Sequence, residues 1–295
     1  MSTNNSVKLY QGDSLSKLKK WSSISKYKYF FDAVITSPPY NCGLSTSTYY
    51  ECTDNRSDDE FIKWNIDYFN QFDKILTENG LIIWNLSYFK HNAYLPTLVI
   101  AAIIKETPFT LIDTISWDKG KQMQNSEGRL SRQVELIYVF ARKTYDDRLS
   151  TEYNIYNDDN KKQFNYIKTS GAKDERTNIR KSLGLGISLI SEFGCNTTAV
   201  YPENLINQIL DIYKNGEKNN KKRWKNVLDP FAGTGTTGFS CINNNINFYG
   251  IEYSENCYNF MINHFLKKDC NVYGNDKLQK IKKKSSSPKK NRIRK

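Results

Sequence analysis

The sequence predicts an α/β protein with a doubly wound, mostly parallel sheet and helices on both of its faces. Short apolar runs alternate with longer amphipathic ones along most of the chain, as strands alternate with crossover helices in a parallel sheet. An apolar run that leads into a glycine-rich turn near residue 230 is typical of a nucleotide-binding crossover. A chain of 295 residues is long enough for one such domain with a smaller insert.

The local patterns predict seven strands and five helices. The expected strands are residues 7–10, 33–36, 81–84, 110–117, 134–140, 227–228 and 248–252. The expected helices are residues 59–76, 94–106, 202–213, 236–243 and 254–266. The last helix has a clear start, because Ser254 can cap it and Glu255 suits the positive end of its dipole. Few residues follow the glycine turn, so strands from the start of the chain must complete the sheet that begins at Val227.

Three segments lack this alternation. Residues 41–59 are polar and follow a pair of prolines, which predicts a mobile loop. Residues 143–198 are rich in Asn, Asp and Lys, and we expect an irregular insert there. Residues 277–295 are strongly basic, which indicates either a disordered, solvated tail or an arm that binds phosphates.

Composition narrows the class of protein. The net charge of +12 suits a polyanionic partner, because phosphate contacts dominate affinity for nucleic acids. No apolar run approaches the ~18 residues that a membrane span needs, and the N-terminus carries no apolar signal segment. The six cysteines include no C-x-x-C pair and only two histidines occur, which argues against a structural zinc site. We therefore expect a cytoplasmic protein with no membrane segment and no metal.

The segment Val-Leu-Asp-Pro-Phe-Ala-Gly-Thr-Gly-Thr-Thr-Gly at residues 227–238 predicts a strand, a tight turn and a helix start. Gly233 and Gly235 let the backbone turn and a ligand approach closely, and the helix start offers free N–H groups to an anion. The next strand ends in Glu252, near the ~20-residue spacing at which an acid accepts hydrogen bonds from ribose hydroxyls. The pattern indicates a nucleotide-like cofactor, and together with Gly238 it also matches the dinucleotide fingerprint.

The strand that precedes Thr36 runs into Ser37, Pro38, Pro39 and Tyr40, at the edge where open α/β sheets bind ligands. One interpretation is a stiff turn, because each proline fixes φ and lacks an N–H. The other is methyl transfer to an exocyclic amine, a poor nucleophile on which positive charge develops as the methyl arrives. Ser37 Oγ and the Pro38 carbonyl could stabilise that charge, and Tyr40 could stack on a base swung out of the duplex.

Taken together, the two motifs resemble the amino-methylating DNA methyltransferases of restriction–modification type. The catalytic segment precedes the cofactor loop in the chain, which resembles the β group of that family. The resemblance covers most of residues 7–142 and 199–266. It implies the seven-stranded, Rossmann-like sheet of the S-adenosylmethionine-dependent methyltransferases.

The resemblance also implies domains, partners and roles. Residues 1–142 and 199–270 would form the catalytic and cofactor-binding domain, residues 143–198 the target-recognition insert, and residues 41–59 a lid over the flipped base. S-adenosyl-L-methionine would be the cofactor and double-stranded DNA the substrate, while a cognate restriction endonuclease and a homodimer stay open. The cofactor site would comprise Asp229, Phe231, Gly233, Gly235, Thr236 and Thr237, with Glu252 on the ribose, Asp13 at the adenine end and Thr36 near the methionine part. The catalytic roles would fall to Ser37, Pro38, Pro39 and Tyr40.

Alternatives remain open at this point. Family members with Ser before Pro-Pro-Tyr mostly methylate cytosine at N4, and those with Asp or Asn there mostly methylate adenine at N6, so Ser37 favours cytosine N4 over adenine N6. A nicotinamide-dependent oxidoreductase would use the glycine turn but would leave the Pro-Pro segment unexplained. A catalytically inactive DNA-binding module would need neither motif intact. Methyl transfer requires the glycine turn and the double proline to meet at neighbouring strand tips.

Overall fold

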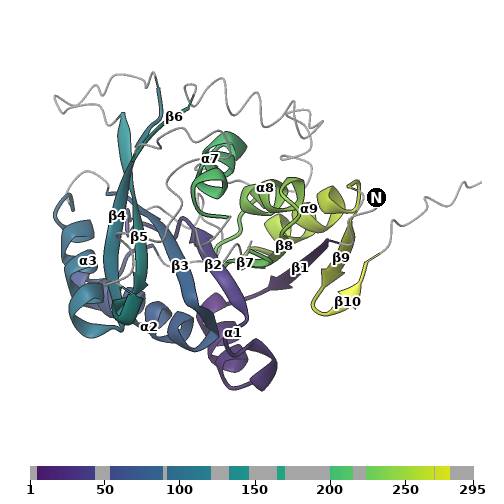
Figure 1. The fold of residues 1–295 in the computed structure, drawn as a ribbon, viewed down its shortest axis with the longest axis horizontal. Coiled ribbons are helices and arrows are strands. Elements are labelled where there is room, and N and C mark those ends of the chain that lie inside the picture. Colours follow the sequence, from purple (N-terminus) through teal and green to yellow (C-terminus); the bar gives the residue numbers. More distant parts are fainter. Residues whose placement is uncertain are drawn as a thin grey trace, which may run out of the picture.

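Among the residues that the structure describes, one mixed sheet of ten strands forms the centre of the fold (Figure 1). The computed structural model describes residues 5–43, 54–88, 92–120, 133–145, 165–169, 200–214, 224–268 and 270–279. Within these residues the strand order is β10-β9-β1-β8-β7-β2-β3-β5-β4-β6. The strands are β1 (Ser6–Gln11), β2 (Phe31–Thr36), β3 (Leu76–Leu86), β4 (Phe109–Asp118), β5 (Val134–Arg142), β6 (Tyr166–Lys168), β7 (Asn226–Asp229), β8 (Asn247–Glu252), β9 (Asn271–Gly274) and β10 (Lys277–Leu278).

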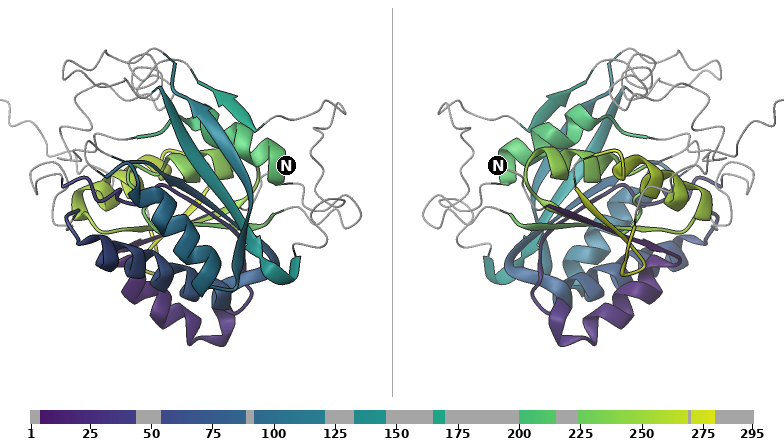
Figure 2. Two further views of the ribbon diagram at one scale, coloured as in Figure 1. Left: turned by 90° about the vertical axis from the view of Figure 1, so that its left-hand side faces the viewer. Right: turned by 90° about the vertical axis from the view of Figure 1, so that its right-hand side faces the viewer.

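Helices cover both faces of this sheet. They are α1 (Ser14–Ser22), α2 (Asp58–Ile75), α3 (Leu95–Glu106), α7 (Glu203–Tyr213), α8 (Thr236–Asn243) and α9 (Glu255–Phe265), with short 3₁₀ turns η1 (Ser25–Tyr27) and η2 (Lys143–Tyr145). Figure 2 shows α1, α2 and α3 on one face and α7, α8 and α9 on the other. No helix in the described part of the chain has the length and apolar character that a membrane span requires.

The seven expected strands are all present, as β1, β2, β3, β4, β5, β7 and β8. They stand side by side in the order β1-β8-β7-β2-β3-β5-β4, so the N-terminal strand pairs with the C-terminal half of the chain, as predicted. Pairing is mostly parallel, and β5 alone among these seven runs antiparallel to its neighbours β3 and β4. The five expected helices are also present. The predicted doubly wound α/β class is therefore confirmed.

Helix α1 and three short strands go beyond the prediction. Leu18 and Trp21, one helical turn apart, are buried and anchor α1 on the sheet. At the other end of the chain, Asn275 and Asp276 both adopt positive φ, 47° and 67°. Two such residues in succession suit a tight hairpin turn. The chain therefore turns back as β10, antiparallel to β9, at the start of the segment expected to be a basic tail.

The other expected irregular segments are described in part. Within the insert at 143–198, η2 follows β5, and β6 pairs in parallel with β4 at the end of the sheet order. The rest of that insert, at 146–164 and 170–198, lies outside the described residues, as do 280–295 of the tail. So do residues 44–53 of the expected lid.

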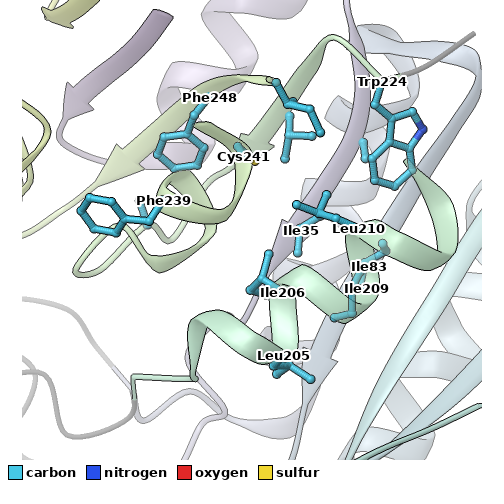
Figure 3. Packing of buried hydrophobic residues seen from close by; sticks show 14 of the residues in the cluster. Ile35, Ile83, Leu205, Ile206, Ile209, Leu210, Trp224, Phe239, Cys241 and Phe248 are labelled. Carbon is cyan, nitrogen blue, oxygen red and sulfur yellow. The ribbon is translucent and has the colours of Figure 1, made fainter. Parts of the chain in front are cut away.

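Alternate residues of β2 enter two separate cores. Ala33 and Ile35 belong to the cluster beneath α7, α8 and α9, whereas Val34 belongs to the cluster beneath α1, α2 and α3. Figure 3 shows Ile206 and Leu210 of α7 beside Ile35. A strand that is buried on both faces is apolar along its length. β2 is thus held rigidly from both sides up to its carboxyl end, where the Pro-Pro segment begins.

Candidate active site

The Pro-Pro segment and the glycine loop leave the sheet at neighbouring strand tips. β2 and β7 are parallel neighbours, with Ala33 opposite Val227 and Val34 opposite Leu228. β7 is followed in the sheet order by β8 and then β1, all parallel. Parallel strands end at the same edge of a sheet, where open α/β folds bind ligands. The two motifs that the sequence singled out are therefore brought together.

Asp229, at the end of β7, is the point where the two loops are joined. Its Oδ1 accepts hydrogen bonds from Thr36 Oγ1 at 2.6 Å and from the Phe231 N–H at 3.0 Å. Its Oδ2 accepts from Thr237 Oγ1 at 2.7 Å and from the Tyr201 hydroxyl at 3.1 Å. Burial raises the pKa of the Asp229 carboxyl, while these donors favour the ionised form and oppose that rise. Asp229, Thr36 and Thr237 thus fix the shape of the two loops from within.

Glycine is required at the three positions of the loop for different structural reasons. Gly233 and Gly235 have φ of +54° and +84°, which other residues adopt only at a cost. A Cβ on Gly238 would lie 2.5 Å from the Phe248 ring and 2.6 Å from the Phe265 ring. Gly238 therefore allows α8 to approach β8 and α9. The first two glycines shape the turn, and the third serves packing.

Glu252, at the end of β8, faces the glycine loop. Its Oε2 accepts a hydrogen bond from the Gly233 N–H at 2.7 Å, and its Oε1 accepts one from the Ser254 N–H at 2.8 Å. Burial raises the pKa of the Glu252 carboxyl from 4.5 to about 7, although the backbone donors oppose the rise. A carboxylate at this position can accept hydrogen bonds from ribose hydroxyls.

Asp13 lies at the next strand tip. The Gly12 N–H donates to the Glu252 carbonyl at 2.9 Å, which places Asp13 beside the β8 tip. The Asp13 side chain caps α1 by accepting a hydrogen bond from the Ser16 N–H at 2.8 Å. A Cβ added to Gly12 would meet no atom within 4 Å, and one added to Gly233 would meet only the Phe231 carbonyl oxygen, at 4.0 Å. The backbone is thus open to close approach by a ligand at both turns.

Phe231 joins an aromatic cluster beside the glycine loop. Its ring centroid lies 5.1 Å from Tyr68, 5.5 Å from Trp64 and 6.1 Å from Trp84. The Arg56 guanidinium lies 4.7 Å from the Trp64 ring. α2 supplies Trp64 and Tyr68, and the sequence analysis did not single out either of them. Their spacing of four residues on one helix face was the available signal.

The Pro-Pro segment is held in place by its tyrosine. Ser37 Oγ lies 2.7 Å from the Tyr40 hydroxyl, which donates to Asn85 Oδ1 at 2.7 Å and lies 3.4 Å from Glu135 Oε2. Pro38 is buried, whereas Ser37, Pro39 and Tyr40 are half-buried. Asn85 and Glu135 come from β3 and β5, and neither lies in a motif of the sequence.

The chain after Tyr40 is fastened to the segment that leads into α2. The buried carboxylate of Asp54 accepts hydrogen bonds from the N–H groups of Asn41 at 2.8 Å and Cys42 at 3.0 Å. The Arg56 N–H donates to Asn41 Oδ1 at 2.7 Å. Ser57 then caps α2 together with Glu60. Both ends of the expected lid are therefore anchored beside the Pro-Pro segment.

Comparison with known proteins identifies a family. Residues 31–264, well over half of the chain, match the model of a family described as DNA methylase (N6_N4_Mtase). The type II methyltransferase M.BglII of Bacillus subtilis is 24% identical over 259 residues, which make up 83% of this chain and 65% of that relative. The chain therefore spans less than two thirds of the length of M.BglII.

Solved structures have the same fold. The PvuII DNA methyltransferase, described as cytosine-N4-specific, superposes with a TM-score of 0.63 at 16% identity, over 89% of this chain and 87% of that one. The M1.HpyAVI–SAM complex superposes with a TM-score of 0.56 at 19% identity, over 86% and 98%. The fold of this chain is thus that of the S-adenosylmethionine-dependent methyltransferases.

Proposed function

This chain belongs to the DNA methylase family, and from that premise we propose that it transfers a methyl group from S-adenosyl-L-methionine to the exocyclic amine of a base in double-stranded DNA. The observation that carries the proposal is the hydrogen bond from Thr36 to Asp229. It joins the residue before Ser37 to the residue that begins the glycine loop. Methyl transfer needs donor and acceptor in near contact, so the two segments have to be neighbours.

The residues at the strand tips suit this cofactor. S-adenosyl-L-methionine supplies a methyl group that is activated by a positively charged sulfur. We assign Glu252 to its ribose hydroxyls and Asp13 to its adenine end, and Gly233 leaves room for it to approach the backbone. Gly235, Thr236 and Phe231 complete the loop that faces it, while Thr36, Asp229 and Thr237 hold that loop in shape through their mutual hydrogen bonds.

The Pro-Pro segment suits the chemistry of the acceptor. Ser37 Oγ and the Pro38 carbonyl would accept hydrogen bonds from the amine and stabilise its developing positive charge. Pro38 and Pro39 restrict the backbone, so this carbonyl reorganises little during the reaction. The Tyr40 hydroxyl is tethered to Asn85, which fixes the ring that we assign to stacking on the flipped base.

The target base is the finer part of the proposal. Ser37 stands where the resemblance associates serine with cytosine N4 and Asp or Asn with adenine N6. We therefore propose cytosine N4 as the acceptor, and adenine N6 is the alternative. Both amines present N–H donors to the same pair of acceptors, so the geometry described above serves either one.

We extend the proposal to the organisation of the chain. Residues 1–142 and 199–270 form the catalytic domain, residues 143–198 read the target sequence, and residues 41–59 close over the flipped base. The remaining proposals are a cytoplasmic location, a basic tail that is either solvated or in contact with DNA phosphates, a cognate restriction endonuclease and a homodimer. Protection of the 41–59 segment from protease by cofactor and DNA together, and by neither alone, is the test of the lid.

One experiment tests both the reaction and the base. The protein is expressed in a host without DNA methylation of its own, and the host DNA is sequenced by a method that distinguishes N4-methylcytosine from N6-methyladenine. We expect one of these bases at a fixed sequence, and none in cells that express Ser37→Ala. Calorimetry with S-adenosyl-L-methionine and with NAD tests the cofactor, and binding of NAD instead would overturn the proposal.

A further inference from the structure

The side chains behind the Pro-Pro segment form a chain of hydrogen bonds with a defined direction. We infer that Asn85 and Glu135 orient the Tyr40 hydroxyl so that Ser37 donates to Tyr40 and presents only its lone pairs to the substrate base. Ser37 then selects bases that carry an amine over bases that carry a carbonyl at the same position. This inference rests on the proposed function and names positioning residues of the same site.

The orientation of Asn85 is set by its other partner. Asn85 is buried near the carboxyl end of β3, and its Nδ2 lies 3.1 Å from the carbonyl oxygen of Leu136 on β5. A carbonyl oxygen only accepts hydrogen bonds, so the amide nitrogen has to face Leu136. The amide oxygen of Asn85 consequently faces Tyr40.

The Tyr40 hydroxyl carries one hydrogen, and its neighbours among the described residues include the oxygens of Ser37, Asn85 and Glu135. Asn85 Oδ1 at 2.7 Å and Glu135 Oε2 at 3.4 Å are both acceptors. If the hydrogen pointed at Ser37, an oxygen lone pair of Tyr40 would face Asn85 Oδ1 at 2.7 Å, which is repulsive. Tyr40 therefore donates away from Ser37, and the Ser37 hydroxyl, 2.7 Å away, donates to Tyr40.

Glu135 is itself held in place by a cation. Lys119 Nζ lies 2.6 Å from Glu135 Oε1, and the two side chains are only 18% and 14% exposed. Lys119 donates to Oε1 of Glu135, and Oε2 is the oxygen that lies near Tyr40. A second acceptor on that side of the hydroxyl favours the same direction of donation.

This direction decides which chemical groups the site accepts. The single hydrogen of Ser37 is directed at Tyr40, so the oxygen keeps lone pairs for an incoming N–H. The Pro38 carbonyl is also an acceptor. An amine offers two N–H donors to this pair, whereas the carbonyl oxygen of uracil or hypoxanthine would meet lone pairs only. Sites built to pair with one polar group discriminate strongly against its counterpart.

The test compares two variants and their combination. Tyr40→Phe removes the hydroxyl but keeps the ring, and Asn85→Leu removes the fixed acceptor at similar volume. We expect each to lower the single-turnover methylation rate about tenfold, the effect of one hydrogen bond made in the transition state. Because both act through the hydroxyl of Tyr40, the double variant should be no slower than Tyr40→Phe alone. Effects that multiply would show independent roles and overturn the inference.

A second measurement needs no turnover. Two kinds of duplex are titrated with each variant. One carries at the target the unmodified base that the wild-type protein methylates, and the other carries its carbonyl counterpart (uracil for cytosine, hypoxanthine for adenine). In Tyr40→Phe and Asn85→Leu the freed Ser37 hydroxyl can donate to the carbonyl. We expect the dissociation constant for the carbonyl duplex, divided by that for the amine duplex, to fall about tenfold from its wild-type value. A mispaired base is easier to flip whichever variant binds it. This effect is the same for every variant, so it cancels when their ratios are compared.

Two further variants separate orientation from structural support. Asn85→Asp keeps an acceptor for Tyr40 but loses the donor to Leu136, and it should hold the wild-type ratio. A ratio as low as that of Asn85→Leu would assign Asn85 to anchoring β5 and overturn the inference. Asn226→Leu is the matched control, because Asn226 Nδ2 donates to the Phe30 carbonyl at 3.2 Å at the opposite edge of the sheet. It should keep the wild-type rate and ratio.

The outcomes also distinguish this inference from the function on which it rests. If the wild-type protein methylates no DNA, the proposed function fails. If it methylates DNA while Tyr40→Phe and Asn85→Leu, with thermal melting that confirms folding, keep the wild-type ratio, the inference alone fails.

Discussion

The Thr36 hydroxyl donates to the Asp229 carboxylate at 2.6 Å, although the two residues are 193 positions apart in the sequence. Both side chains are buried. Thr36 ends β2 and Asp229 ends β7, so this bond fixes the separation of the two strand tips from which the proposed catalytic and cofactor segments leave. Disturbing it should affect stability and cofactor binding together.

Replacing Thr36 with valine removes the donor while keeping the branched shape. The buried Asp229 carboxylate then loses a hydrogen bond, and we expect the free energy of unfolding to fall by about 1–3 kcal/mol. Urea denaturation of both proteins measures the difference. Thr97→Val, at an exposed position of α3, is the control. An equal loss of unfolding free energy in that variant would show that the bond from Thr36 to Asp229 contributes no stability of its own.

Two glycine variants should separate binding from packing. Gly238→Ala forces a Cβ to 2.5 Å from Phe248, so we expect a loss of about 1–3 kcal/mol in the free energy of unfolding. Gly233→Ala meets no close atom, and its positive φ costs about 1–2 kcal/mol. Its methyl group projects into the space assigned to the cofactor, so it should weaken binding of S-adenosyl-L-methionine in calorimetry. Equal affinity in wild type and Gly233→Ala would refute that assignment.

Glu252 should make stability depend on pH. Its carboxyl has a pKa of about 7 in the folded protein, above the ordinary value of 4.5. Between those values the unfolded chain is ionised while the folded chain keeps its proton, so the folded state binds more protons. The contribution of Glu252 to stability is therefore fully present below 4.5 and is lost as the pH rises towards 7. The melting temperature should decline less steeply across this pH range in Glu252→Gln than in the wild type. Parallel curves of melting temperature against pH would contradict the raised pKa.

Asp13 has two roles that different substitutions separate. Asp13→Asn keeps a side-chain oxygen that can cap α1, whereas Asp13→Ala removes the cap and should cost about 1 kcal/mol of stability. If Asp13 also contacts the adenine end of the cofactor, the asparagine variant should lose cofactor affinity with little loss of stability. Calorimetry and urea denaturation of the two variants give both quantities. Wild-type affinity in Asp13→Asn would remove Asp13 from the cofactor site.

The sequence was sufficient to predict the centre of the fold. Central strands such as β2 and β3 contain short apolar runs because both of their faces are buried, and Val34 and Ile35 enter different cores. Where a signal was weaker, an element was missed: α1 depends on a cap at Asp13 and two buried apolar residues within nine positions. The strand β10 depends on the left-handed conformations of Asn275 and Asp276, which composition alone does not reveal.

The candidate site was predictable only where a local motif marks it. The motifs predicted that the Pro-Pro segment and the glycine loop are neighbours, and β2 and β7 do pair. A motif does not say which partners a side chain has, and Asp229 is buried among the hydroxyls of Thr36, Thr237 and Tyr201. Asn85 and Glu135 carry no local signal. They reach Tyr40 only because β3 and β5 pair in antiparallel register, a long-range property that a single sequence does not encode at either position.

The strand β1 has a consequence for the order of synthesis. It is synthesised before the other described strands, whereas its partners in the sheet, β8 and β9, are synthesised only after β2 to β7. Until then β1 has no neighbour to pair with, and such distant pairings slow folding. A polypeptide released before β8 would lack both the support for β1 and the acid that ends β8. The sheet, and with it the proposed cofactor site, would thus be complete only in molecules synthesised through β9, never in shorter translation products.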